Sequence, residues 1–403
     1  MSTQIPNIED TRELLKKNQI GIVGVGETAQ GKIPGKSSFH FLSEASKLAI
    51  EDAGIQKSDV DGVITAFSLV EETFMHCTTF ADYIGINPKY FESVAIGGAT
   101  AVWMTAAAAM AINSGQAEVV LCVRGDNTLS GISSAGMIAL IREMCHGEFE
   151  YPFGLTTPGG YALMAQRYLY ESKGKREHLH SVAVTMRQHA QLKENAMNKD
   201  DLSLDDIMNT RLLASPLTKF DCSIVSDGGA AFIVTTNAKA KELGLKKDPV
   251  YLHGMGQGFS HQYLTSCADL DQIYGAIEAS GQKAFKTAGM TNKDVDLTFL
   301  YDCFTITTLL ELEGLGIVPR GQAGAAALEG RLHKDADIPL NTHGGLLSQA
   351  HLGAMHHVVE AVLQLRGEAG QRQVKNPNTA LVHGNGGIVS AHSTIILGNE
   401  PLS

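Results

Sequence analysis

The chain has 403 residues, of which 44% are hydrophobic and 19% charged, a balance typical of a folded globular protein rather than a disordered or fibrous one. Its formal net charge of −11 argues against nonspecific binding of nucleic acid, because a phosphate backbone selects basic surfaces. The longest apolar run, residues 99–112, is shorter than the roughly 20 residues that a membrane span requires, and residues 1–20 lack the apolar core of a signal peptide. We therefore expect a cytoplasmic protein.

Short apolar runs alternate with helical patterns along the first part of the chain. Helical patterns at residues 43–54 and 99–112 separate the strand-like runs, which lie at residues 20–26, 61–67, 93–96 and 117–123. This alternation predicts a layered α/β fold built from βαβ-type units. The glycines of "GVGET" lack the third glycine and the acidic residue of a dinucleotide fingerprint, so this turn favours a structural role.

The stretch "VAIGGATAVWM", residues 94–104, runs from a strand through two glycines into an Ala-rich helix. An α/β enzyme often carries a nucleophile at such a turn. No Ser, Cys or Lys stands here. The protein has either lost a nucleophile or performs chemistry that needs none.

The cysteines show no CxxC pair and no ligand spacing, so neither a zinc site nor a disulfide framework is predicted. We expect most of them to be reduced, buried and apolar in behaviour, with a reactive thiol at one of them as the alternative. They are Cys77, Cys122, Cys145, Cys222, Cys267 and Cys303.

An internal repeat relates the two halves of the chain. "AIEDAGIQKSDVD", residues 49–61, aligns without a gap with "AFKTAGMTNKDVD", residues 284–296. In each copy a helix ends at an Ala-Gly cap and continues through a polar turn into a strand. Because the period is far longer than that of a solenoid, the repeat predicts two duplicated halves, which we place at residues 20–240 and 248–398. The first includes a covering region at about residues 129–215.

Five segments in this order resemble the thiolase superfamily, in particular the branch of the sterol-carrier-protein-type thiolases and their bacterial relatives. They are "AIEDAGI..DVD", "VAIGGATAVWMTAAAAMAINSGQAEVVLCV", "YDCFT", "NTHGGLLSQAHLGAM" and "ALVHGNGG". The resemblance implies a five-layer αβαβα fold made of two duplicated halves, a homodimer, and coenzyme A as part of an acyl-CoA substrate, with no covalently bound cofactor and no metal. Relatives in this branch often work with a small zinc-ribbon/OB-fold acyl-CoA-binding protein, and the chain contains no such module.

The glycine-rich turns depart from the family pattern. Gly98 stands where thiolases carry the acyl-accepting cysteine, and the loop that holds their second catalytic cysteine contains Gly386 here. Free backbone N–H groups at a helix N-terminus still suit an oxyanion, so we expect both glycines to form a cradle for the thioester oxygen. The alternative for Gly98 is that it only allows close packing.

Four side chains are candidates for acid/base chemistry. His351 corresponds to the family histidine that acts near the reacting centre, and it is the first choice because imidazole titrates near neutral pH. Tyr301 replaces the histidine of the H-D-C-F motif, and its phenol can exchange a proton with a reacting oxygen; a buried structural tyrosine is the alternative. His383 and His343 are weaker candidates, and each can equally have a structural role.

These losses favour retro-aldol cleavage of a β-hydroxyacyl-CoA without a covalent acyl-enzyme, because that reaction needs acid/base groups and an oxyanion pocket but no thiol. A thiolase-type acyltransferase with a displaced nucleophile is one alternative, and it requires Cys77, Cys122, Cys267 or Cys303 to reach the pocket. A non-catalytic acyl-CoA-binding subunit is the other.

Overall fold

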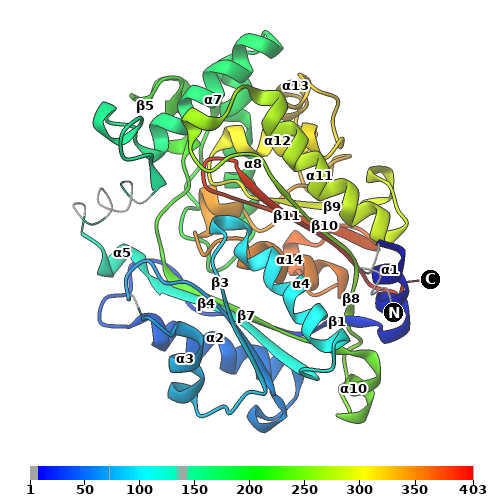
Figure 1. Cartoon of the computed structure of the whole chain (residues 1–403). Helices are drawn as coiled ribbons and strands as arrows, with labels where there is room; N and C mark the ends of the chain where they lie inside the picture. The colour runs from blue at the N-terminus through cyan, green and yellow to red at the C-terminus, as the bar shows by residue number, and fades with distance from the viewer. Residues whose placement is uncertain (1–7, 72, 134–135, 137–141, 143, 403) are drawn as a thin grey trace.

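The computed structural model describes residues 8–71, 73–133, 136, 142 and 144–402, and nine strands of this part form one continuous sheet (Figure 1). Its order is β3-β2-β4-β7-β1-β8-β11-β10-β9. The strands of the first half are β1 (Ile20–Glu27), β2 (Gly62–Ala66), β3 (Tyr90–Val94), β4 (Val119–Asn127) and β7 (Asp227–Thr236). Those of the second are β8 (Val250–Phe259), β9 (Leu297–Leu300), β10 (Thr379–Gly386) and β11 (Ala391–Gly398).

The two halves repeat the same pairing pattern. In the first half β3, β2 and β4 are parallel, and β7 lies antiparallel between β4 and β1. In the second half β9 and β10 are parallel, and β11 lies antiparallel between β10 and β8. A parallel bridge from Thr298 to Leu340 takes the place that β3 has in the first half. The halves join where β1 pairs with β8, so the predicted duplication is confirmed.

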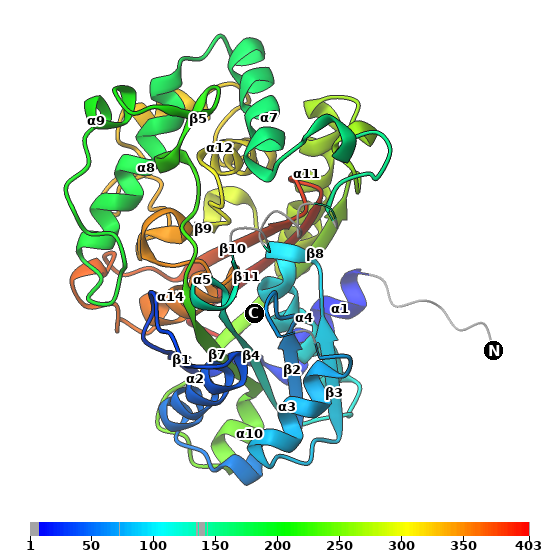
Figure 2. The same cartoon turned by 90° about the vertical axis from the view of Figure 1, so that its left-hand side faces the viewer.

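Helices form three layers around the two halves of the sheet (Figures 1 and 2). On one outer face lie α2 (Ser38–Ala53) and α3 (His76–Ile84), and α11 (Leu270–Ala288) and α12 (Thr305–Gly314) lie on the opposite side. The middle layer contains α4 (Thr100–Asn113) and α14 (Met355–Leu365), which contact each other and strands of both halves. The predicted five-layer αβαβα arrangement is therefore present.

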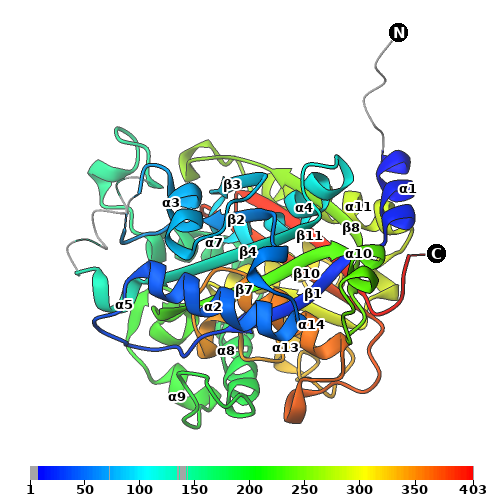
Figure 3. The same ribbon diagram turned by 90° about the horizontal axis from the view of Figure 1, so that it is seen from below.

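Glycines in the first strand of each half let the outer helices approach closely. A Cβ on Gly24 would lie 2.3 Å from the carbonyl oxygen of Ala49 in α2, and one on Gly256 would lie 2.2 Å from that of Ser280 in α11. The glycines of "GVGET" therefore have the structural role expected of them. Seen from below, α2 runs across β1, β7 and β4 (Figure 3).

The repeated helix ends also have the predicted form. Gly54 closes α2 with φ of 74°, and Gly289 closes α11 with φ of 66°, a left-handed conformation that glycine adopts without strain. In both copies a short 3₁₀ turn follows, η1 (Lys57–Asp59) and η6 (Asn292–Asp294).

The remaining elements cover the edges of these layers. The predicted covering region contains α5 (Thr128–Gly131), η3 (Tyr151–Phe153), α7 (Thr157–Ser172), α8 (Arg176–Gln191), α9 (Leu204–Met208) and β5 (Leu212–Ala214), while residues 134–135, 137–141 and 143 of it lie outside the described residues. Elsewhere lie α1 (Ile8–Asn18), β6 (Leu217–Thr218), η4 (Lys219–Asp221), α10 (Asn237–Glu242), η5 (Leu264–Ser266), α13 (Ala323–Leu328) and η8 (Gly370–Arg372). No helix in the described ranges has the length and apolarity needed to cross a bilayer.

Candidate active site

The turn before α4 has no room for a side chain at Gly98. The chain leaves β3, forms a 3₁₀ turn, η2 (Gly97–Ala99), and enters α4. A Cβ on Gly98 would lie 2.0 Å from Cζ of Tyr301 and 2.4 Å from the carbonyl oxygen of Asn385. The phenol ring of Tyr301 therefore occupies the space into which a side chain at position 98 would project.

The second predicted cradle residue lies against the same turn. A Cβ on Gly386, at the end of β10, would lie 2.2 Å from the carbonyl oxygen of Ile96. Gly97 adopts φ of 59° and contacts the backbone of Gly386. The structure thus brings Gly98 and Gly386 together beside the N-terminus of the buried helix α4.

Tyr301 and His351 meet directly, although 50 residues separate them in the sequence. The Tyr301 hydroxyl lies 3.0 Å from Nε2 of His351. Tyr301 follows β9 and is buried, while His351 follows the π-helical turn η7 (Gly345–Gln349) and is partly exposed. Ser226 fixes the backbone of His351, because its Oγ accepts from the His351 N–H at 2.9 Å and donates to the His351 carbonyl at 3.3 Å.

Both members of this pair are held in their neutral forms. Although His351 is partly exposed, the protein atoms packed around its ring desolvate it and lower its pKa to about 3, and the charge of Arg124 adds to this effect. Burial also raises the pKa of Tyr301 above its ordinary value, which the charge of Arg124 opposes. At neutral pH a phenol thus faces an uncharged imidazole, an arrangement through which one proton can move from oxygen to nitrogen and back.

A buried carboxyl group positions the backbone of Tyr301. The Tyr301 N–H donates to Glu311 of α12 at 3.0 Å, and the side-chain amide of Asn385 donates to the other oxygen of the same carboxyl group. Thr307 donates to the Tyr301 carbonyl at 2.7 Å. Burial raises the pKa of Glu311 well above its usual range, and the two hydrogen bonds that it accepts oppose this shift.

Asp302 ties the loop that carries His351 to the end of β9. Its carboxylate accepts from the backbone N–H groups of Leu346 at 2.9 Å and Leu347 at 3.2 Å. A Cβ on Gly345 would lie 1.9 Å from one of its oxygens, and φ of Gly345 is 62°, so only glycine fits there. These contacts set the position of η7 relative to Tyr301.

The structure places His343 inside this loop and away from the pair. Its Nδ1 accepts from the Gly345 N–H at 2.9 Å, and its ring packs at 4.8 Å against that of His357. Burial and the neighbouring cations hold the pKa of His343 well below its ordinary value. This geometry fits the structural role that is the alternative for His343 in the sequence analysis, in which its ring orients the loop by hydrogen bonding.

His383 lies on the face of β10 opposite the two cradle glycines. Gly384 and Gly386 face η2, so the alternation of a strand turns His383 toward the outer layer. There its ring bonds to Thr394 Oγ1 at 2.8 Å and to His392 Nδ1 at 3.1 Å. The structure does not bring His383 to Tyr301 or His351.

All six cysteines are free thiols, and four of them are buried. Cys303 lies closest in sequence to the pair, but its Sγ packs 3.5 Å from the Tyr161 hydroxyl, and burial raises its pKa above the ordinary value. Burial likewise raises the pKa of Cys77, Cys122 and Cys267. None of these settings provides the positive charge that a thiolate nucleophile requires. Within the described parts of the chain, no group of three or more His, Cys, Asp or Glu is arranged to hold a metal.

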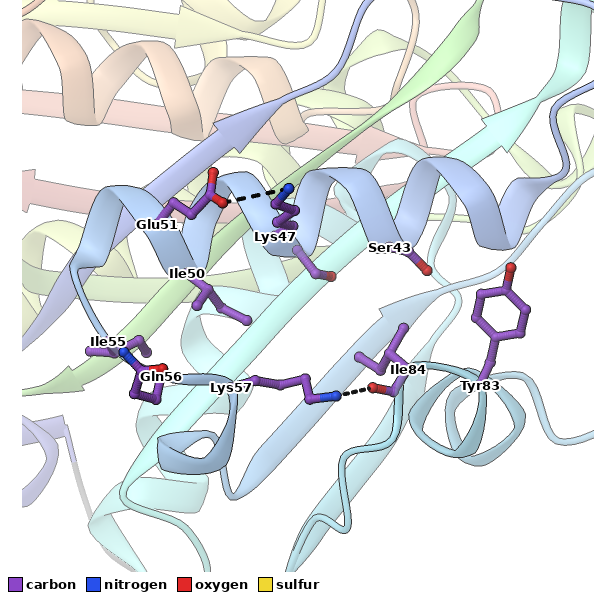
Figure 4. A pocket seen from close by; sticks show the side chains of 10 residues that line it. Ser43, Lys47, Ile50, Glu51, Ile55, Gln56, Lys57, Tyr83 and Ile84 are labelled. Atoms are coloured by element: carbon purple, nitrogen blue, oxygen red, sulfur yellow. Dashed lines mark hydrogen bonds and ion pairs between the residues drawn. The ribbon is translucent and has the colours of Figure 1, made fainter.

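Two surface cavities lie elsewhere. A groove of about 550 Å³ runs between α2 and α3, on the side of the sheet opposite α4, and Lys57 closes one wall by donating to the Ile84 carbonyl (Figure 4). A second cavity of about 490 Å³ lies beside α8 and α9 and is lined by Arg187, Asp200 and Leu347 among others. Neither includes Tyr301 or His351.

Sequence comparison finds relatives along nearly the whole chain. A family model described as "Thiolase C-terminal domain-like" matches residues 256–399. The chain is 34% identical to a steroid side-chain-cleaving aldolase of Thermomonospora curvata, over 91% of this chain and 95% of that protein. It is 32% identical to an acetyl-CoA acetyltransferase of Methanothermobacter thermautotrophicus, over 93% of this chain and 98% of that protein.

Structure comparison gives the same result. A solved structure entitled "Ltp2-ChsH2(DUF35) aldolase" superposes with a TM-score of 0.84 at 32% identity, over 96% of this chain and 99% of that one. The overall fold is therefore shared with that protein.

Proposed function

Since this chain belongs to the thiolase superfamily, in the branch that joins the sterol-carrier-protein-type thiolases to side-chain-cleaving aldolases, we propose that it is a carbon–carbon lyase that cleaves a β-hydroxyacyl-CoA by a retro-aldol reaction. The family identification made from the sequence motifs is confirmed. Coenzyme A enters as part of the substrate.

The position of the Tyr301 ring carries this proposal. It fills the space beyond Gly98, the place of the acyl-accepting cysteine in the family pattern, and its hydroxyl bonds to His351. A Claisen-type thiolase reaction needs a thiol at that point to take the acyl group. A retro-aldol reaction needs instead a group that removes the proton of the β-hydroxyl and a group that returns a proton to the α-carbon.

The pair can perform both transfers. As the β-hydroxyl gives its proton to the Tyr301 oxygen, the phenol proton passes to Nε2 of His351, and the C–O bond becomes C=O while the Cα–Cβ bond breaks. The bond electrons move into the thioester as an enolate. Return of the same proton through Tyr301 to the α-carbon then gives a ketone or aldehyde and an acyl-CoA, and the pair regains its neutral state. The cradle at Gly98 and Gly386 lies beside α4, whose N-terminus favours the enolate oxygen.

A steroid-like or aromatic acyl part and a second subunit fit the same proposal. The relatives include a protein named for steroid side-chain cleavage, and the superposed structure is entitled as a two-component aldolase with a DUF35 protein. We extend this to a homodimer of the present chain assisted by a small zinc-ribbon/OB-fold acyl-CoA-binding protein, acting in the cytoplasm. Sedimentation analysis that finds a stable monomer at micromolar concentration contradicts the homodimer.

The deciding experiment compares two variants of the pair. His351→Ala removes the proton acceptor and is expected to lower turnover of a β-hydroxyacyl-CoA by about 10²- to 10⁴-fold, with little change in acyl-CoA affinity. Tyr301→Phe keeps the ring that packs on Gly98 and removes only the hydroxyl, so a comparable loss reports proton transfer. The readout is release of ketone or aldehyde, with the second subunit added where it is needed. Near-full activity of both variants removes the pair from the mechanism.

One relative named as an acetyl-CoA acetyltransferase keeps a second candidate function open, retro-Claisen acyl transfer with a displaced cysteine. A covalent acyl adduct detected by intact mass would favour it. A protein that binds acyl-CoA but cleaves neither a β-hydroxyacyl-CoA nor a β-ketoacyl-CoA would be a non-catalytic subunit.

A further inference from the structure

One cation is buried beside the Tyr301–His351 pair. Arg124 lies in β4, within the apolar run "VVLCVRG", and only 6% of its surface is exposed. Its Nη1 lies against the backbone of Gly353, two residues after His351, because a Cβ there would come within 2.2 Å of it. Its positive charge lowers the pKa of both Tyr301 and His351, in addition to the larger effect of their burial. The guanidinium thus borders the proposed reaction pocket.

Arg124 has no counterion in the part of the chain that the structure describes. Its Nε is buried without a hydrogen-bond partner, and its guanidinium packs on the ring of Phe67, whose centre lies 5.3 Å from Cζ. The carboxyl groups of this region have other partners: Asp126 accepts from the loop after β2, Asp302 accepts from η7, and Glu311 accepts from the Tyr301 N–H and the Asn385 amide. A buried charge is normally paired, because leaving water costs it more than burial returns.

We infer that Arg124 is an anion-binding residue of the reaction pocket, and that its guanidinium receives a negatively charged oxygen of the acyl group next to the bond that breaks. This inference rests on the proposed function. The oxygen has two possible sources with one chemistry: a carboxylate that the acyl chain carries, or the enolate oxygen that cleavage creates. A guanidinium offers several fixed N–H donors to either kind of oxygen, and the exclusion of water from a buried site strengthens the contact.

The first arm of the test measures binding and needs no turnover. Calorimetry compares succinyl-CoA with butyryl-CoA, which share coenzyme A and a four-carbon chain and differ in the terminal carboxylate. If the substrate carries the anion, the wild-type protein is expected to bind succinyl-CoA about tenfold more tightly or better, since a charge-assisted hydrogen bond contributes at least that ratio. Arg124→Gln removes the preference and leaves butyryl-CoA affinity within about twofold of wild type. Lys239→Gln removes one partly exposed, ion-paired positive charge in α10 and serves as the matched control, with the preference unchanged.

The second arm measures turnover of a neutral β-hydroxyacyl-CoA. If cleavage creates the anion, the two esters bind equally well, and Arg124→Gln lowers kcat by about 10²- to 10³-fold while KM stays within about threefold. Added guanidinium chloride restores part of the activity of Arg124→Ala, which a purely structural loss would not allow. Arg124→Lys keeps the charge without the planar fork and is expected to retain intermediate activity.

The inference is overturned when both arms are negative, that is, when Arg124→Gln changes neither the ester preference nor kcat. A lower melting temperature of Arg124→Gln with unchanged binding and kcat identifies a structural residue and also overturns it. Failure of the proposed function looks different: the wild-type protein binds both esters and cleaves no β-hydroxyacyl-CoA. In that case the binding arm decides alone, and equal affinity for the two esters overturns the inference.

Discussion

Replacing Gly98 with alanine places a methyl group where the Tyr301 ring now lies. The new Cβ would stand 2.0 Å from Cζ and 2.4 Å from Cε1 of Tyr301, and 2.4 Å from the carbonyl oxygen of Asn385. Real Cβ atoms essentially never approach closer than 3.0 Å, so the ring and the backbone of β10 must both move. Overpacking of a core costs typically 1–3 kcal/mol, and the two separate clashes place this variant at about 3 kcal/mol.

Displacement of the ring adds a second loss. It breaks the hydrogen bond between Tyr301 and His351, which contributes about 1 kcal/mol. We therefore expect Gly98→Ala to lower the free energy of unfolding by about 4 kcal/mol. In a Tyr301→Ala background the clash with the ring is gone while that with Asn385 remains, so the same substitution is expected to cost about 2 kcal/mol less there.

Equilibrium unfolding in urea at fixed protein concentration measures these differences. The single tryptophan, Trp103, lies in α4 one turn after Gly98 and reports on this region by fluorescence. Gly275→Ala is the matched control, because Gly275 is exposed in α11 and a Cβ added there would have nothing within 4 Å. It is expected to be neutral or to stabilise by up to about 1 kcal/mol. A cost of less than about 1 kcal/mol for Gly98→Ala, or no coupling to Tyr301, refutes the idea that the ring has taken the nucleophile's place.

Three further outcomes follow from the site and its burial. Intact mass after incubation with a cleavable acyl-CoA is expected to show no acyl adduct, and single Cys→Ser variants should keep turnover within about tenfold; a stable adduct contradicts the acid/base mechanism. Burial raises the pKa of Glu311 in the folded protein, whereas the same carboxyl group ionises above about pH 4.3 in the unfolded chain, so wild-type stability falls as the pH rises above that value. Glu311→Gln should therefore gain stability over wild type by up to about 1.4 kcal/mol per pH unit above pH 4.3, and a pH-independent difference in urea midpoints argues against a raised pKa of Glu311. Burial lowers the pKa of His392 to about 3 and that of its partner His383 well below normal, so wild-type stability should be fully present above about pH 6.5 and fall as the pH drops toward 3. A His383→Gln, His392→Gln double variant should lose less of its free energy of unfolding between pH 7 and pH 5 than the wild type does.

The fold could be predicted from the sequence because it depends on local residue patterns. Three such features can be read from residues close together in the sequence. They are the repeated Ala-Gly helix ends, the alternation of apolar runs with helices, and the glycines that face α2 and α11. The position of His383 was also accessible, since a strand alternates its faces and Gly386, three residues later, was expected at the cradle. That alternation already directs His383 to the opposite side.

Long-range features of the site had no such signal. Tyr301 and His351 were expected to act at one centre because the motifs that carry them resemble those of the family, but no periodicity reveals that the Tyr301 ring excludes a side chain at position 98. Glu311 and Arg124 were missed. Each is a charge inside an apolar segment, "TITTLLELEG" and "VVLCVRG", and a buried charge of that kind indicates either a protonated group or an unpaired ion that awaits a ligand.

The two duplicated halves contribute different parts of the candidate site: the first half contributes Gly98, and the second contributes the acid/base side chains Tyr301 and His351. In both halves a turn leads into a buried helix, α4 or α14, and the two turns lie beside the same centre. The first turn carries Gly98, and the second carries His351. Tyr301 follows β9, the counterpart of β2, and its ring fills the space into which a side chain at position 98 would project. A side chain at position 98 and the Tyr301 ring therefore exclude each other: a cysteine does not fit at position 98 while Tyr301 stays, so a variant that introduces a thiol there must change both residues.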